Sequence, residues 1–385
     1  MKKCEICELS KWHVFPEWNH GRSVTTAGKI VDESLGKAQC KECGLIQRIS
    51  HDFLGNSSFY EDSYQTYYER LTPGVSESNR YSAIVQWICD SITGNNPRSI
   101  VDIGCGRGDA IEEMMSRYPS SKIIGIEPSI GNSEIARKIG LNIVTGMLND
   151  VEMESGVNDL VYSINVFQHT TSPREFLEDA KMLLNEKGKL VIVCPDATVP
   201  GNEMMWCDQN FSFSPTHLFS LARDAGLEVV SWQKAEQDIL ADKQIIVLAL
   251  IDEVQESASF GRQVSLDIPQ SINLHTNYIH AWSQLDYHLL AKIQGKKNVY
   301  NFGASMWSYL LRAYCPRYWS MVKACIVDEC EGQFMDRKVI PVNMSTFGKD
   351  DIVVIGANPK SHSSLKKKFE ENGVDVVIWD ALIQG

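Results

Sequence analysis

The chain has 385 residues, a formal net charge of −12, 43% hydrophobic residues and 22% charged residues, as expected for a globular protein of two or three domains. The negative charge and the lack of a long basic run in the sequence argue against nucleic acid or an anionic membrane as the main partner. No apolar run approaches the roughly 20 residues of a membrane-spanning helix, and Met1-Lys2-Lys3 does not open a signal peptide, so we expect a cytoplasmic protein.

Two cysteine pairs lie near the start of the chain. Two residues separate Cys4 from Cys7 and Cys40 from Cys43, and 32 residues lie between the pairs. Without a secretion signal, eleven cysteines favour thiols and metal binding over disulfides. Two such pairs can surround one tetrahedral Zn²⁺ and leave no open position for water. The sequence therefore predicts a structural zinc site, with four incidental thiols as the alternative.

Residues 51–75 form a polar connection that is rich in aromatic side chains, namely Phe59, Tyr60, Tyr64, Tyr67 and Tyr68. These side chains can either line a ligand pocket or pin a linker to the core. The next stretch, Tyr81 to Ile92, is predicted to be a helix because its apolar residues recur on one face.

A glycine-rich turn follows, at residues 104–108. Ile100 to Ile103 are an apolar run of β-branched residues broken by Asp102, as in a buried parallel strand. Glycines stand at 104, 106 and 108, and a helix-compatible segment covers 110–117. Strand, glycine turn and helix open a nucleotide-binding βαβ unit. The dinucleotide pattern G-x-G-x-x-G is not met, because Asp109 stands where its third glycine would be.

A second strand, Lys122 to Ile126, ends at Glu127, where an acidic side chain can bind ribose hydroxyls. With Asp102 two residues before the first glycine, this pattern resembles the class I S-adenosylmethionine (SAM) methyltransferases. In these enzymes the first carboxylate faces the amino-acid part of SAM and the second holds the ribose. The resemblance implies SAM-binding residues at Asp102, Gly104, Cys105, Gly106, Glu127, Pro128, Gly146, Met147, Leu148, Asn165 and Val166; NAD binding and a ligand-free turn are the alternatives.

Strands and helices alternate from residue 97 to residue 250, which implies a mostly parallel sheet with helices on both faces. The further elements expected here are a helix with Ile135 to Ile139, strands at 142–144, 159–164 and 190–194, a turn at Lys187-Gly188, and a helix that opens with the capping box Ser172-Pro173-Arg174-Glu175. His169 falls at the carboxyl edge of the sheet, where ligands bind. It can orient or deprotonate an acceptor, or be a loop histidine that is hydrogen-bonded to the backbone.

Residues 270–385 are predicted to form a smaller α/β domain. An amphipathic helix is expected at 278–293, then a strand at 298–302 and a tight turn at Gly303-Ala304-Ser305, where a helix start could receive a phosphate. Later apolar runs cover 324–327, 352–355 and 374–379. The expected domains are therefore a zinc-binding and substrate-enclosing module (1–75), a SAM-binding domain (76–255) and a C-terminal domain that binds nucleotide or substrate (270–385).

The order of these features resembles the zinc-containing, SAM-dependent nucleotide-sugar methyltransferases, including the C-3 methyltransferases of deoxysugar pathways. The resemblance rests on the four-cysteine module with Cys-Gly-Leu-Ile-Gln at 43–47, the SAM turn, the segment 166–177, Val-Cys-Pro-Asp at 193–196, and Phe-Gly-Ala at 302–304 with Val-Asp at 327–328. It implies a class I doubly wound sheet, SAM and Zn²⁺ as cofactors, and a nucleotide-sugar enclosed by the N-terminal and C-terminal parts. The sugar, the methylated atom and the oligomeric state stay open.

One segment departs from that family. Its C-methylating members carry a Glu-His pair, whose histidine removes a proton from carbon, and Asp208 and Gln209 stand in that place here. Glutamine cannot take a proton at neutral pH. O- or N-transfer therefore competes with C-transfer, and other candidate bases are Asp208, His169, His217 or a tyrosine of the 60–68 cluster. The acceptor-side candidates are Asp208, Gln209, Tyr64 and His169; a catalytically silent binding protein of the same fold is the alternative function.

Overall fold

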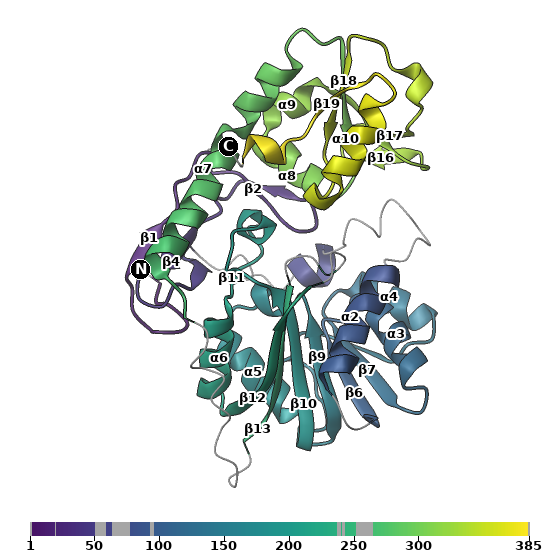
Figure 1. The fold of residues 1–385 in the computed structure, drawn as a ribbon. Coiled ribbons are helices and arrows are strands. Elements are labelled where there is room, and N and C mark those ends of the chain that lie inside the picture. Colours follow the sequence, from purple (N-terminus) through teal and green to yellow (C-terminus); the bar gives the residue numbers. More distant parts are fainter. Residues whose placement is uncertain are drawn as a thin grey trace.

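The computed structural model describes residues 2–19, 21–50, 59–63, 78–92, 96–236, 240, 243–251 and 265–383. A large sheet domain, a small N-terminal module and a second sheet domain at the C-terminal end are seen together in Figure 1. Among the described helices, none has the length and apolar character needed to cross a lipid bilayer.

The central domain is a seven-stranded sheet of order β12-β13-β10-β9-β6-β7-β8. Its parallel strands are β6 (Ser99–Ile103), β7 (Lys122–Glu127), β8 (Ile143–Thr145), β9 (Asn158–Ile164) and β10 (Leu184–Pro195). The antiparallel hairpin β12 (Leu227–Lys234) and β13 (Lys243–Leu250) completes one edge. Because β6 has β7 on one side and β9 on the other, the strand order reverses at β6, and a ligand crevice is expected at the carboxyl ends of these strands.

Helices cover both faces of this sheet. They are α2 (Ser78–Ser91), α3 (Asp109–Arg117), α4 (Ile130–Lys138), α5 (Pro173–Met182) and α6 (Pro215–Asp224). Alternate residues of β10 pack into separate hydrophobic cores on the two faces of the sheet. Leu190 and Ile192 pack with α5 and α6, whereas Val191 and Val193 pack with α2 and α3. The sheet is thus doubly wound, as predicted.

Two local predictions in this domain need correction. β10 begins at Leu184, so Lys187 and Gly188 lie inside the strand at a register shift against β9 rather than in a turn before it. At α5 the Ser172 hydroxyl accepts the Glu175 N–H at 3.3 Å, but the reciprocal bond of a capping box does not occur among the described contacts.

The N-terminal module is a small antiparallel sheet of order β1-β4-β5-β11, formed by β1 (Trp12–Val14), β4 (Lys37–Cys40), β5 (Ile46–Arg48) and, from much later in the chain, β11 (Phe211–Ser212). A second hairpin pairs β2 (Ser23–Val24) with β3 (Ile30–Val31). Residues 59–63 form the single helical turn η1 (Phe59–Ser63). Since β11 joins the module's sheet, the module and the central domain are directly fused by strand pairing.

The C-terminal domain is a six-stranded sheet of order β16-β17-β15-β14-β18-β19. Its strands are β14 (Asn298–Phe302), β15 (Val322–Val327), β16 (Gly332–Phe334), β17 (Arg337–Pro341), β18 (Asp351–Ile355) and β19 (Asp375–Val377); its helices are α8 (Met306–Tyr314), α9 (Pro316–Met321) and α10 (His362–Glu370). Short helical turns occur in both large domains, at η2 (Phe167–His169), η3 (Asn202–Met205), η6 (Met344–Thr346), η7 (Pro359–Ser361) and η8 (Asp380–Leu382).

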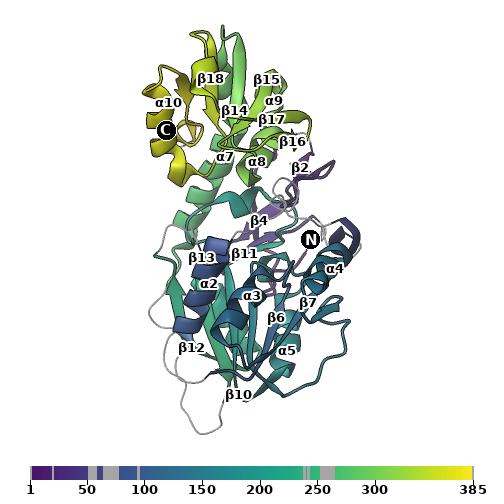
Figure 2. The ribbon, with the colours of Figure 1, turned by 90° about the vertical axis from the view of Figure 1, so that its right-hand side faces the viewer.

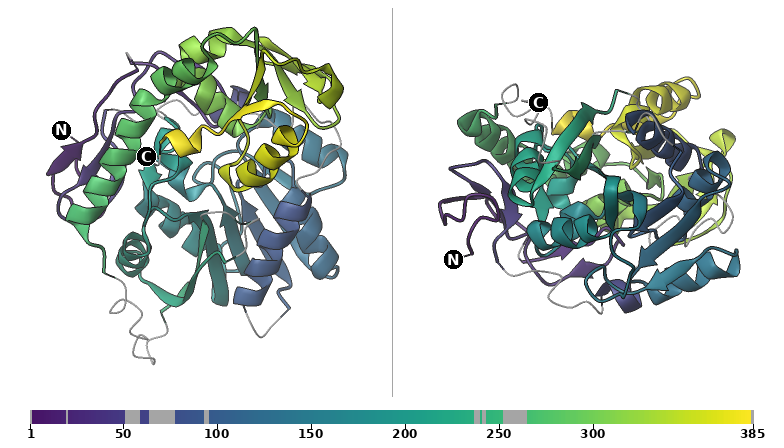
Figure 3. Two further views of the ribbon diagram at one scale, coloured as in Figure 1. Left: turned by 45° about the horizontal axis from the view of Figure 1, so that its top comes forward. Right: turned by 90° about the horizontal axis from the view of Figure 1, so that it is seen from below.

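The long helix α7 (Ile268–Ile293) connects the lower and upper parts of the molecule and starts ten residues before the predicted amphipathic stretch. Its first half is bound to the N-terminal module, where Gln39 Nε2 donates to Ser271 Oγ at 2.8 Å and His13 Nε2 lies 3.0 Å from Thr276 Oγ1. Its second half enters the core of the C-terminal domain, where Trp282 packs on Trp379. The helix is seen beside the N-terminal module in Figures 2 and 3.

Candidate functional site

A cavity of about 1330 Å³ opens at the carboxyl ends of the central strands, below the C-terminal domain. All eleven residues predicted to bind SAM line it: Asp102, Gly104, Cys105, Gly106, Glu127, Pro128, Gly146, Met147, Leu148, Asn165 and Val166. Other walls come from the N-terminal module (Thr26), the η1 turn (Tyr60) and the C-terminal part (including Trp307, Lys360 and Trp379). Segments far apart in the sequence therefore share one cavity.

The glycine turn brings the backbone close to this cavity. Gly104 has φ +74°, and a Cβ there would lie 2.3 Å from Val166 Cγ2, so the position has no room for a side chain. Gly106 has φ +56° and faces open space. Both positions use the left-handed region that glycine adopts without strain. The turn thus leaves room for a ligand at the start of α3.

Asp102 is buried beside the cavity, and its Oδ2 has no hydrogen-bond partner within the described part of the chain. Burial raises the pKa of the Asp102 carboxyl to about 8, although the neighbouring Tyr162 hydroxyl opposes the rise. A buried acceptor without a partner is unusual in native proteins. It fits a cationic ligand group, such as the ammonium of an amino acid, which would favour the carboxylate form.

Glu127 stands at the end of β7 and holds the glycine turn in place. Its Oε2 accepts the Gly106 N–H at 2.8 Å, and its Oε1 accepts the Ser129 N–H at 2.9 Å. These bonds fix the carboxylate at the wall of the cavity. Each carboxylate oxygen has a second lone pair, so ribose hydroxyls could also bind there.

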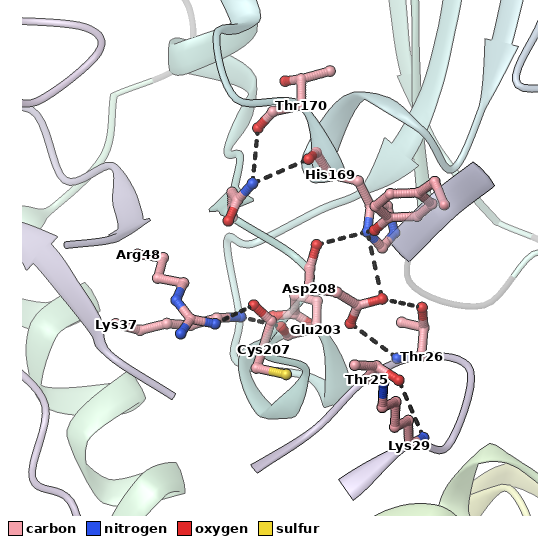
Figure 4. Close-up of polar contacts among 12 residues, drawn as sticks. Thr25, Thr26, Lys29, Lys37, Arg48, His169, Thr170, Glu203, Cys207 and Asp208 are labelled. Atoms are coloured by element: carbon pink, nitrogen blue, oxygen red, sulfur yellow. Dashed lines mark hydrogen bonds and ion pairs between the residues drawn. The ribbon is translucent and has the colours of Figure 1, made fainter. Parts of the chain in front are cut away.

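His169 ends the η2 turn and lines the same cavity. Its Nδ1 lies 2.8 Å from the backbone oxygen of Asp208, 3.0 Å from the Tyr60 hydroxyl and 3.9 Å from Asp208 Oδ2 (Figure 4). A carbonyl oxygen can only accept, so Nδ1 carries the proton and Nε2 keeps its lone pair. Burial lowers the pKa of His169, while Asp208 opposes this and Lys37 adds to it. The imidazole is therefore neutral near pH 7.

The other acceptor-side candidates occupy different places. Asp208 is fully buried behind His169 and does not line the cavity; its carboxylate accepts the Thr26 N–H at 2.9 Å and the Thr26 hydroxyl at 2.5 Å. Gln209 does line the cavity, and its Oε1 has no partner among the described residues. Tyr64 lies outside the described residues. Tyr60 is the tyrosine of that cluster that the structure places on His169.

Buried cations of the N-terminal module hold the loop at 201–210. Lys37 Nζ donates to the Glu203 backbone oxygen at 2.5 Å, and Arg48 Nη1 donates to the Cys207 backbone oxygen at 2.7 Å. Lys37 is 3% exposed, so its ammonium group is buried between the module and this loop. No local sequence pattern predicts the roles of these residues or of Thr26, because each contacts a partner more than 150 positions away.

The four predicted metal ligands come together. The sulfur atoms of Cys4, Cys7, Cys40 and Cys43 all lie within 4.8 Å of one another, with 3.4 Å between Cys4 and Cys43 and 3.5 Å between Cys7 and Cys40. Four thiolates around a tetrahedral Zn²⁺ at about 2.3 Å would be separated by about 3.8 Å. The donor set and its spacing therefore fit such an ion.

His217 belongs to the framework around this cluster. The Ser214 N–H donates to His217 Nδ1 at 3.0 Å, and His217 Nε2 donates to the backbone oxygen of Cys43 at 2.9 Å. Both ring nitrogens are thus used, and His217 does not line the cavity. The histidine connects the start of α6 to the second cysteine pair and is structural.

Known proteins are similar to this chain mainly in its central domain. Residues 77–232 match the family model described as a methyltransferase domain. The trans-aconitate 2-methyltransferase of Acidovorax ebreus (strain TPSY) is 25% identical over 207 residues, which cover 49% of this chain and 77% of that protein. An uncharacterized 37.1 kDa protein in transposon TN4556 of Streptomyces fradiae is 29% identical over 113 residues, which cover 28% of this chain and only 33% of that protein.

Among solved structures, geranyl diphosphate C-methyltransferase from Streptomyces coelicolor A3(2) is similar to 47% of this chain over 86% of its own, with 13% identity and a TM-score of 0.38. A similarity at that level carries no argument about function. The family match and the strand order support the same assignment of the central domain. The chain therefore contains a SAM-dependent methyltransferase domain with a Rossmann-like α/β sheet, carried by residues 77–232.

Proposed function

We propose that the protein transfers a methyl group from SAM to a nucleotide-linked sugar or a related activated small molecule. The observation that carries the proposal is one cavity that joins the glycine turn to walls from the N-terminal module, the η1 turn and the C-terminal part. Its volume of about 1330 Å³ exceeds the usual 300–1,000 Å³ of a site for one small ligand. Two ligands, a methyl donor and an acceptor, fit that size.

On the donor side, Asp102 binds the ammonium group, Glu127 the ribose hydroxyls, and the loop at Gly146, Met147 and Leu148 the adenine. When bound, SAM supplies an electrophilic methyl group on a sulfonium sulfur. The four cysteines would hold a structural Zn²⁺, which would take no part in the chemistry because four thiolates leave no open position.

On the acceptor side, the C-terminal wall has the chemistry to hold a nucleotide. Trp307, Tyr278 and Lys360 line the cavity, and the buried Trp379, which packs on Trp307, reaches its edge. Ser305 stands at the N-cap of α8, and a helix start favours anionic groups. These features support an acceptor that carries an aromatic base and a phosphate, which is the substrate class that the resemblance implies.

His169 takes the acceptor proton. The acceptor atom forms a bond to the methyl carbon, the pair of the carbon–sulfur bond stays on sulfur, and the proton moves to Nε2 of His169. A neutral imidazole suits this step near pH 7. The base can serve an O–H, an N–H or a C–H beside a carbonyl, so the three kinds of transfer still compete. The Gln209 amide orients the acceptor and moves no proton.

The test is to incubate the purified protein with methyl-labelled SAM, a small-molecule extract of its source cells and a panel of nucleotide-linked sugars, and to identify labelled products by mass spectrometry. We expect a labelled nucleotide-sugar, whose fragments place the methyl group on carbon, oxygen or nitrogen. A labelled product without a nucleotide would overturn the substrate class. No labelled product from protein that binds SAM would favour the catalytically silent alternative.

A further inference from the structure

We infer that Thr26 of the N-terminal module is a positioning residue for the methyl transfer, because it fixes the Asp208 carboxylate behind His169. The inference rests on the proposed function, in which His169 is the base. It assigns to the zinc-bearing module a direct part in the active site. The module would complete the proton-accepting group of another domain.

The first support is the geometry of Asp208. One residue approaches His169 with two groups: its backbone oxygen lies 2.8 Å from Nδ1, and its Oδ2 lies 3.9 Å from the same atom. Thr26 binds both carboxylate oxygens, with its N–H on Oδ1 and its hydroxyl on Oδ2 (Figure 4). The oxygen that faces the imidazole is thus the one that the Thr26 hydroxyl holds.

The second support is the rigidity of the turn that carries Thr26. Two backbone hydrogen bonds close this turn: Thr25 N donates to Lys29 O at 2.9 Å, and Gly28 N donates to Thr25 O at 2.8 Å. On one side, Val24 pairs with Trp206 in a parallel bridge. These contacts fix Thr26 from within its own turn and from the loop that carries Asp208.

The third support is the charge around His169. The described groups that face it are the Asp208 carboxylate, the buried Lys37 ammonium and the Tyr60 hydroxyl. When Nε2 takes a proton, the imidazolium is stabilised by a carboxylate within 4 Å. Asp208 opposes the lowering of the His169 pKa that burial and Lys37 cause. Its position therefore changes how readily the buried base accepts a proton.

The experiment follows the titration of His169 by NMR in protein with ¹⁵N-labelled histidine, with the signal assigned through His169→Gln. We expect the Nδ1-protonated tautomer in the neutral form, and a fall of about 1 unit in the His169 pKa on Asp208→Asn, as for the loss of a nearby opposite charge. Thr26→Val should shift the pH midpoint of the His169 titration when Asp208 is present. It should leave that midpoint unchanged in the Asp208→Asn background. Thr26→Ser should restore the original midpoint.

Thr25→Val is the matched control, because it removes a hydroxyl one position away that binds Lys29 N and not Asp208. It should leave the titration unchanged. A Thr26→Val protein that binds SAM and titrates like the original would overturn the inference, as would an equal shift in both backgrounds. Because this readout needs no acceptor, it is independent of the search for a labelled product, so either proposal can fail alone.

Discussion

At the scale of single residues, Asp102 shows a conflict between binding and stability. Its carboxyl is buried, and Oδ2 has no hydrogen-bond partner among the described residues, which costs free energy in the empty protein because desolvation disfavours the charged form. The same lack of a partner leaves it available to a cationic ligand. A site of this kind is expected where function, rather than stability, selects the residue.

Asp102→Asn should therefore stabilise the empty protein and weaken SAM binding. The folded-state pKa of about 8 lies above the ordinary aspartate value of 3.8, so the folded state retains a proton that the unfolded state loses between these values. The wild type loses stability as pH rises from about 4 to about 8, by at most about 1.4 kcal/mol per pH unit. The variant lacks this loss, so its advantage in urea unfolding should be larger at pH 8 than at pH 5.

In the same variant, calorimetry should show an affinity for SAM that is lower by about tenfold or more, the loss expected for one charge-assisted hydrogen bond. Tyr162→Phe keeps the carboxylate but removes the hydroxyl that opposes the rise of the Asp102 pKa, so it should weaken SAM binding less than Asp102→Asn does. An unchanged affinity of Asp102→Asn would remove Asp102 from the donor site.

Residues predicted from local patterns lie together in the structure, since all eleven residues predicted to bind SAM line one cavity. The donor-side residues come from one turn and the ends of adjacent strands, so their spacing in the sequence is enough to bring them to one cavity. Thr26 and Asp208 are 182 positions apart, and neither belongs to a recognisable pattern. Their pairing depends on how the N-terminal module docks, which no short stretch of sequence encodes.

At the scale of elements, the cysteine cluster and the loop at 201–210, which carries Asp208 and Gln209, are both attached to one small sheet. β4 ends at Cys40, β5 follows Cys43, and β11 pairs with β5 just beyond Gln209. An ion at the cysteines would hold β4 and β5 in register, and β5 in turn holds β11. In the proposed function, metal binding and acceptor positioning would thus be coupled through strand pairing.

Removing the metal with a chelator should therefore lower methyl transfer much more than SAM binding. We expect a loss of activity of tenfold or more, an affinity for SAM within about threefold of the loaded protein, and faster proteolysis of residues 1–50, since structural zinc contributes folding free energy. Cys40→Ser should reproduce these effects, and Cys330→Ser, outside the cluster, should not. A parallel loss of SAM affinity would show that the ion supports the central domain instead.

Elements were predicted well in type and less well at their ends. The strand at 298–302 has the bounds expected from its apolar run. The start of α7 was missed although the sequence contains a signal: Asp267 caps the helix by accepting the Gln270 N–H at 3.0 Å, and Pro269 stands in its first turn. β10 was expected six residues too late, since Lys187 and Gly188 usually mark turns and are here part of an irregular strand.

At the scale of the whole molecule, the N-terminal module lies between the two larger domains and contacts both. Gly28 in the turn after Thr26 packs against Tyr309 of α8, and Tyr309 is itself stacked on Phe334. The ring cannot move away without disturbing the C-terminal core. The acceptor cavity thus depends on a close fit between parts that fold from distant stretches of the chain.

Gly28→Ala should disturb this fit. A Cβ at Gly28 would lie 2.2 Å from the Tyr309 ring, and φ is +77°. Gly21→Ala is the matched control, since φ is +73° and its Cβ would meet nothing within 4 Å. Both variants carry backbone strain of about 1 kcal/mol or more, but only Gly28→Ala should also lose methyl transfer, measured by labelled product, while SAM affinity by calorimetry stays unchanged. Equal behaviour of the two variants would contradict the role of this contact.

The long helix α7 sets a distance in this assembly. Its 26 residues span about 39 Å, with one end tied to the N-terminal module and the other built into the C-terminal core. It fixes the distance between the N-terminal module and the C-terminal wall of the cavity. A relative with one more turn of α7 between the N-terminal module and the C-terminal core would hold the C-terminal wall about 5.4 Å farther away. It would suit a longer acceptor without any change in the residues predicted to bind the donor.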